Sequence, residues 1–75
     1  MDFKDRLRET RMRKGLAQHE LAARLHVSRG LIGQYEIGTK KPGLDMIAAL
    51  SKVLGTTTDY LIRGETVNNG NVGNI

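Results

Sequence analysis

Glycines and short polar turns divide the first part of the chain into five short segments, and this spacing limits what it can fold into. Each segment is rich in helix formers and carries apolar side chains three or four residues apart, the spacing that faces one side of a helix. No window alternates apolar and polar residues over a useful length, so a β-sheet has little support. The sequence predicts an all-α domain of five helices, at about residues 2–14, 18–25, 29–36, 44–54 and 58–63.

Residues at the predicted helix ends support these boundaries. Ser28 and Thr57 are candidate N-caps of the third and fifth helices, and Pro42 opens the fourth. Glu20 can accept a hydrogen bond from the amide of Ala17, which is one half of a capping box for the second helix. The fourth helix carries a wide stripe that we expect to face the core: Leu44, Ile47, Ala48, Leu50, Ser51 and Leu54.

Composition excludes several classes of protein. The chain has 75 residues, enough for one domain with a small core, and no cysteine for a disulfide, a thiolate metal site or a nucleophile. His19 and His26 cannot form a metal shell alone, and no catalytic triad, carboxylate pair or phosphate-binding loop is evident. We therefore expect that the protein is not an enzyme and that it binds no metal and no cofactor. Since no apolar run is long enough for a membrane span or a signal peptide, we expect a cytoplasmic protein without a membrane partner.

Charge and chain organisation suggest the kind of partner. The formal net charge is +4 and the pI is near 9.9, a balance that favours polyanions such as nucleic acid. Between residues 15 and 43, four basic residues face only two acidic ones, Glu20 and Glu36. We expect residues 1–64 to form the domain and the polar, glycine-rich residues 65–75 to be a disordered tail or the start of a linker.

The connection between the second and third predicted helices is the most informative feature. Only about three residues, 26–28, separate them, too few for the helices to lie antiparallel, so they must cross steeply. A steep crossing projects the third helix from the surface, and the major groove of B-DNA, about 12 Å wide, accepts a helix of that diameter. Two helices of an ordinary small bundle are the alternative.

A series of residues distinguishes between a DNA-binding helix pair and an ordinary bundle. It comprises Arg6-Leu7-Arg8-Glu9, Arg11, Lys14-Gly15-Leu16, Gln18, Glu20-Leu21-Ala22, Leu25, Val27-Ser28, Ile32, Tyr35-Glu36, Gly38, Pro42, Leu44, residues 50–55, Asp59 and Leu61. In its order and spacing, this series resembles the phage-repressor (Cro/C1, or Xre-type) helix-turn-helix family. The resemblance implies a compact five-helix, lambda-repressor-like DNA-binding domain. It also implies a sequence-specific repressor of phage or prophage type that binds a palindromic double-stranded operator as a homodimer, with no small-molecule substrate.

The resemblance implies that the second helix contacts the DNA backbone. It places Gln18 and His19 in the first turn, where the side chain of Gln18 and the helix amides would meet a phosphate. An ordinary exposed glutamine is the alternative. Two residues depart from the family pattern: Ala17 replaces a serine or threonine cap, and His26 replaces the glycine of the turn.

In the third helix, the resemblance implies a base-reading face that starts at Ser28. Arg29 could bind O6 and N7 of a guanine or a phosphate, and Gln34 could bind an adenine or a phosphate. Leu31 could touch a thymine methyl group or pack at the helix edge. Gly30 and Gly33 each cost roughly 1 kcal/mol of helix propensity relative to alanine. Either DNA approaches them closely, or these two positions simply tolerate glycine.

Other residues complete the expected interface. Thr39, Lys40 and Lys41 follow the third helix in a loop that in the family runs beside the phosphates; a plain solvated loop is the alternative. Arg11 and Glu36 occupy positions that often pair in the family, and we expect this pair to be structural.

The expected dimer contacts lie on one surface, and the hypothesis that competes with DNA binding concerns another, the helix-turn-helix. We expect dimer contacts around the fourth and fifth helices, at Tyr60, Leu61 and Ile62. The rival hypothesis is an antitoxin or adaptor that uses the helix-turn-helix to dock a protein. A protein-docking face would be more apolar or aromatic than the polar face expected here, so DNA binding is favoured.

Overall fold

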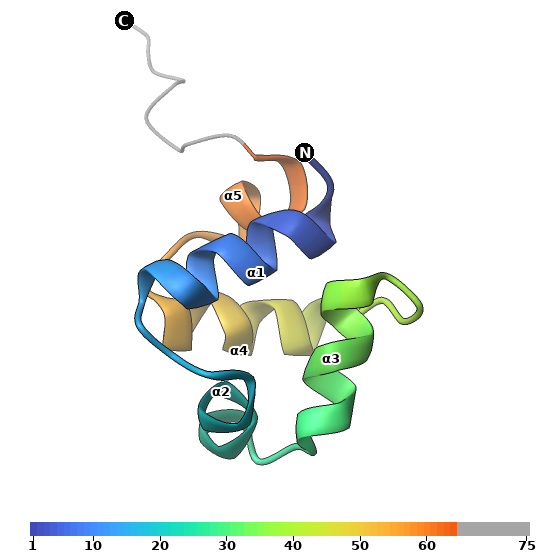
Figure 1. Cartoon of the computed structure of the whole chain (residues 1–75). Helices are drawn as coiled ribbons and strands as arrows, with labels where there is room; N and C mark the ends of the chain where they lie inside the picture. Colours follow the sequence, from blue (N-terminus) through green and yellow to red (C-terminus); the bar gives the residue numbers. More distant parts are fainter. Residues whose placement is uncertain (65–75) are drawn as a thin grey trace, which may run out of the picture.

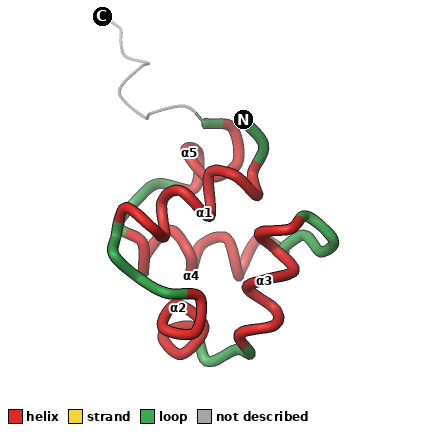
Figure 2. Tube along the Cα trace, in the orientation of Figure 1, coloured by secondary structure: helices red, strands yellow, loops and turns green. Residues whose placement is uncertain are grey.

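The computed structural model describes residues 1–64, which fold into five helices without a strand in this part of the chain (Figures 1 and 2). The helices are α1 (Phe3–Arg13), α2 (Gln18–Leu25), α3 (Arg29–Ile37), α4 (Leu44–Leu54) and α5 (Thr58–Arg63). The predicted all-α fold is therefore confirmed, and each predicted helix end lies within one residue of the observed end. No helix within residues 1–64 is long and apolar enough to cross a membrane. The tail predicted for residues 65–75 lies outside the described residues.

The core draws on all five helices. In Figure 1, α4 runs through the middle of the domain, with α1 and α5 above it and α2 and α3 below and beside it. The side chains that meet there are buried and mainly aliphatic, so their removal from water is the main force that holds these short helices together. They are Leu7, Leu16, Leu21, Ala22, Ile32, Tyr35, Leu50, Leu54 and Leu61.

The predicted stripe of α4 is only partly correct. Ile47, Leu50 and Leu54 are buried, but Leu44 is 81% exposed. Leu44 lies on the first turn of the helix, and a helical pattern gives the face of a residue but not whether another element covers that turn. Ala48 is also exposed.

Arg6 joins the beginning of the domain to its end. Its side chain is buried and donates hydrogen bonds from Nε to the carbonyl of Leu61 (2.9 Å), from Nη2 to the carbonyl of Ile62 (2.5 Å) and from Nη1 to the carbonyl of Met1. The last carbonyls of a helix have no partner within the helix, and the guanidinium group supplies one. This contact fixes α5 against α1.

Candidate nucleic-acid interface

The turn between α2 and α3 sets the two helices at a steep angle. Figure 1 shows α2 nearly end-on, whereas α3 lies close to the plane of the picture, so the two helices cross steeply, as the short connection predicts. His26 ends α2 in the left-handed conformation (φ 59°), and the amide of Val27 donates to the carbonyl of Ala22 at 3.0 Å. Histidine therefore occupies a backbone conformation that is normally costly for a residue with a Cβ atom.

The first turn of α3 is capped and its outer face is free. The Oγ of Ser28 accepts a hydrogen bond from the amide of Leu31 at 3.2 Å, the N-cap contact that the sequence predicts. Ile32 and Tyr35 are buried, whereas Arg29 and Gln34 are exposed. One face of α3 is fixed to the core, and the opposite, polar face is open to a ligand.

Three further residues of α3 lie near this open face. Leu31 is half-buried and packs against the core, so it holds the helix edge. A Cβ atom on Gly30 would meet only the Oγ of Ser28, at 3.9 Å, and one on Gly33 would meet only the Oε1 of Gln18, also at 3.9 Å. Both are ordinary contact distances. The protein itself therefore has room for a methyl group at either glycine.

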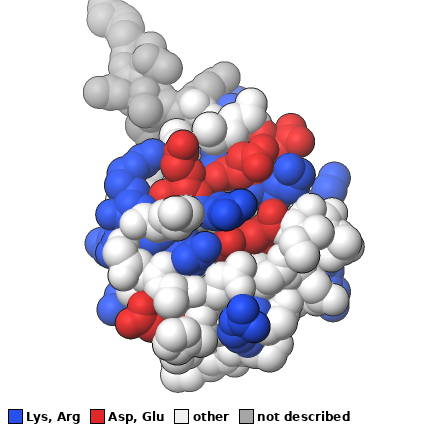
Figure 3. Space-filling view, in the orientation of Figure 1, with Lys and Arg blue, Asp and Glu red and all other residues white. Residues whose placement is uncertain are grey.

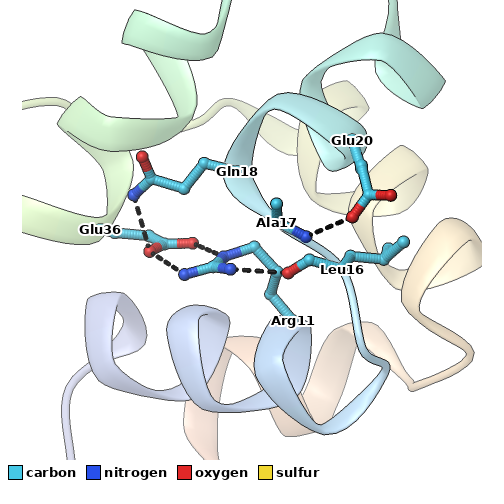
Figure 4. A network of polar contacts seen from close by, with 6 residues as sticks. All are labelled: Arg11, Leu16, Ala17, Gln18, Glu20 and Glu36. Atoms are coloured by element: carbon cyan, nitrogen blue, oxygen red, sulfur yellow. Dashed lines mark hydrogen bonds and ion pairs between the residues drawn. The ribbon is translucent and has the colours of Figure 1, made fainter.

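A buried polar network ties α1, α2 and α3 together (Figure 4). Arg11 donates from Nε to Oε2 of Glu36 (2.6 Å) and from Nη2 to Oε1 of the same carboxylate (3.1 Å). Its Nη1 donates to the carbonyl of Leu16 at 2.7 Å, just before α2 begins. The two charged side chains are 11% and 4% exposed. A two-pronged contact of this kind fixes orientation as well as distance, so the pair sets how α3 sits on α1.

Gln18 belongs to the same network. Its Nε2 donates to Oε1 of Glu36 at 3.1 Å, and its side chain is half-buried rather than freely exposed (Figure 4). This contact joins the first turn of α2 to the last turn of α3. Sequence reasoning did not foresee it, because no local pattern relates two polar residues on different helices. His19, the next residue, is exposed.

The start of α2 has only one half of a capping box. The amide of Ala17 donates to Oε1 of Glu20 at 2.7 Å (Figure 4). Alanine has no acceptor to return a hydrogen bond to the helix amides, so no side chain caps the first turn, although the amide of Glu20 donates to the carbonyl of Ala17 at 3.1 Å. Free amides at a helix N-terminus suit an anionic group such as a phosphate.

The loop after α3 presents two lysines. Gly38 ends the helix with φ 98°, and the amides of Gly38 and Thr39 both donate to the carbonyl of Gln34, at 2.9 and 3.1 Å. The hydroxyl of Thr39 donates to the same carbonyl at 3.4 Å. Lys40 and Lys41 are exposed beyond this cap. The loop thus begins rigidly and carries its charges into solvent beside the end of α3.

The visible charge pattern is mixed over α1 and sparse lower down. Figure 3 shows acidic and basic side chains interleaved across α1 and isolated charges over the lower part, where α2 and α3 lie. The part of this face over α2 and α3 therefore shows no continuous basic patch. The basic groups of the candidate interface are instead the single side chains described above, Arg29, Lys40 and Lys41.

The expected dimer contacts need one correction. Leu61 of α5 is fully buried in the core, so it cannot contact a second copy, and this part of the prediction is wrong. The apolar content of α5 did not indicate which residue the small core would take. Tyr60 is half-buried, and Ile62 is 44% exposed.

Residues 7–61, which make up most of the chain, match the helix-turn-helix family. The chain belongs to the helix-turn-helix family. The match runs from Leu7 of α1 to Leu61 of α5. It includes α2, the turn, α3 and the loop that carries Lys40 and Lys41, called the lysine loop below.

Helix-turn-helix regulators are also similar to this chain in sequence. It is 40% identical over 62 residues to the SPbeta prophage-derived HTH-type transcriptional regulator YonR of Bacillus subtilis, covering 83% of this chain and 57% of YonR. It is 37% identical over 65 residues to the HTH-type transcriptional activator BcrR of Enterococcus faecalis, covering 87% of this chain and 32% of BcrR. The chain thus spans only about half or less of these two relatives.

Solved helix-turn-helix structures share the fold. The P22 c2 repressor in complex with synthetic operator 9T superposes with a TM-score of 0.82 at 31% identity, covering 87% of this chain and 98% of that chain. The solution structure of the P22 c2 DNA-binding domain also gives 0.82, at 29% identity and 91% and 90% coverage. The predicted five-helix repressor fold is confirmed.

Proposed function

We propose that this chain binds double-stranded DNA in a sequence-specific way and represses transcription, with α3 reading an operator in the major groove. The observation that carries the proposal is the placement of α3. A buried network fixes the helix to α1 and α2, while Arg29 and Gln34 remain exposed on its free face. The names of its relatives, a transcriptional regulator and a transcriptional activator, support a role in transcriptional regulation, and the operator-bound P22 c2 repressor supports DNA binding and repression.

Each polar group of the candidate interface then has a role that its chemistry suits. Arg29 would bind O6 and N7 of a guanine, and Gln34 would bind an adenine at its N6 and N7. Gln18, whose amide nitrogen has a second hydrogen to donate, would bind a phosphate with the free amides of the α2 N-terminus. Lys40 and Lys41 would add contacts to the DNA backbone, which carry affinity rather than sequence information.

We further propose a cytoplasmic homodimer on a palindromic operator, with half-sites about one helical turn apart. One module of this size buries only roughly 600–1,000 Å² on DNA, so a second copy would add the affinity that a specific site requires. Exposed apolar side chains near the lysine loop would form the contact. They are Ile37 (69% exposed), Leu44 (81%) and Ile62 (44%).

The experiment is selection of bound duplexes from a random pool, followed by a titration of the selected duplex and of a scrambled one. We expect an inverted repeat that binds at least a thousandfold more tightly than the scrambled duplex at equal salt. Equal affinity for both duplexes would contradict sequence-specific reading. Sedimentation that shows a monomer both free and on the selected duplex would contradict the homodimer.

A further inference from the structure

Lys4 crosses the end of α3, although it comes from the first turn of α1. A Cβ atom placed on Gly38 would lie 2.9 Å from Cδ and 3.5 Å from Cε of Lys4. The aliphatic stem of the lysine therefore lies directly over the backbone of Gly38, in space that only glycine leaves open. This contact brings a residue far away in the sequence to the base of the lysine loop.

The surroundings of Lys4 carry a positive charge. Lys4 lines a cleft together with Lys40 and Lys41, and the one acidic residue in that lining is Asp2. The other lining residues are uncharged: Phe3, Tyr35, Ile37, Gly38, Pro42, Ile47 and Ile62. Three lysines against one aspartate give this cleft, at the C-terminal end of α3, an excess of positive charge.

Within residues 1–64, no strong contact offsets the charge of Lys4. Its Nζ lies 3.4 Å from Oδ1 of Asp5, but the two side chains are 38% and 50% exposed, and exposed pairs of this kind contribute little. A positive charge in the first turn also opposes the helix dipole of α1. The packed stem holds the ammonium group near the loop at a small cost to helix stability.

We propose that Lys4 is a third phosphate-binding lysine, which acts with Lys40 and Lys41 on one stretch of the DNA backbone. This inference rests on the proposed function, since it needs DNA to lie along α3 and the loop. It extends the interface to α1, an element outside the helix-turn-helix itself. Gly38 then serves two purposes: it ends α3, and it leaves room for the stem of Lys4.

The test compares three lysine variants on a duplex of about 20 base pairs with arbitrary sequence, because a phosphate contact does not depend on the bases. The variants are Lys4→Met, Lys40→Met and, as the control, Lys52→Met. Methionine keeps an aliphatic stem and removes the charge. Lys52 is an exposed lysine in the last turn of α4, at the opposite end of the domain from the loop (Figure 1). The dissociation constant is measured against salt concentration, and thermal unfolding checks that each variant is folded.

We expect the slope of log affinity against log salt to fall in magnitude by about 0.9 in Lys4→Met and in Lys40→Met, and to stay unchanged in Lys52→Met. Lys4→Arg should keep the slope of the original protein, since it keeps the charge. A slope in Lys4→Met equal to that of Lys52→Met, with the slope of Lys40→Met lowered, would overturn the inference and leave the proposed function standing. Failure of the unsubstituted protein to bind any duplex at low salt would overturn both.

Discussion

Nε2 of Gln18 lies 3.1 Å from Oε1 of Glu36, and this hydrogen bond joins the first turn of α2 to the last turn of α3. The same carboxylate receives two hydrogen bonds from Arg11. One side chain thus links three helices, and it does so at the place where the helix-turn-helix meets α1. The position of α3 relative to the rest of the domain therefore depends on this contact as well as on its buried residues Ile32 and Tyr35.

Replacement of Glu36 by alanine should therefore destabilise the domain strongly. Arg11 would keep its hydrogen bond to the carbonyl of Leu16 but would be left as a nearly buried charge without an acidic partner, which typically costs about 3–5 kcal/mol. Urea unfolding followed by circular dichroism measures the change. Glu9→Ala is the matched control, because Glu9 pairs with Arg13 at 3.4 Å in an exposed contact and its loss should cost less than about 1 kcal/mol. Similar losses for the two variants would contradict the role of the network.

Arg29→Ala and Lys41→Ala should weaken DNA binding in different ways. Loss of a base contact at Arg29 should cost about 1–3 kcal/mol on the selected operator and relax the preference at one base pair. Loss of Lys41 should weaken binding to every duplex and lower the salt slope. Titrations on the operator and on single-base-pair variants separate the two patterns. If both variants lose affinity equally on all duplexes, Arg29 is not a base reader.

Alanine at Gly33 should make the free protein more stable and the complex weaker. The protein has room for the added methyl group, and alanine in a helix interior is favoured over glycine by about 1 kcal/mol. If DNA approaches the glycine closely, the same methyl group should reduce operator affinity. Gly30→Ala makes the parallel comparison on the same face. An increase in stability with unchanged affinity would show that the position tolerates glycine without needing it.

A hydroxyl at Ala17 should stabilise α2. Its backbone already has an N-cap conformation (φ −77°, ψ 163°), yet it makes no side-chain cap hydrogen bond. Ser28 and Thr57 make that bond at 3.2 and 3.0 Å in the same chain. Ala17→Ser should therefore raise the free energy of unfolding by about 1 kcal/mol, measured as a higher urea midpoint. An unchanged midpoint would indicate that the bond from the amide of Glu20 to the carbonyl of Ala17 (3.1 Å) already satisfies this end of the helix.

Local chemistry explains why the helices could be predicted from the sequence and some site contacts could not. The caps at Ser28 and Thr57 and the left-handed end at Gly38 depend on neighbouring residues, so their signals lie within a few positions. The contact of Lys4 with Gly38, and that of Gln18 with Glu36, depend on how whole helices pack. The burial of Leu61 and the exposure of Leu44 have the same origin, because helical periodicity does not say how far the neighbouring helices extend.

The most direct test of the central claim is a titration of the ¹⁵N-labelled protein with the selected duplex, followed through the backbone amide signals. We expect the largest shifts in residues 29–34 of α3, with further shifts at Gln18, Lys40 and Lys41. The amides of the last turn of α4, around Lys52, should stay nearly unchanged. If no duplex of any sequence shifts the amide signals of α3 at low ionic strength, α3 does not enter the major groove and the proposed function is wrong.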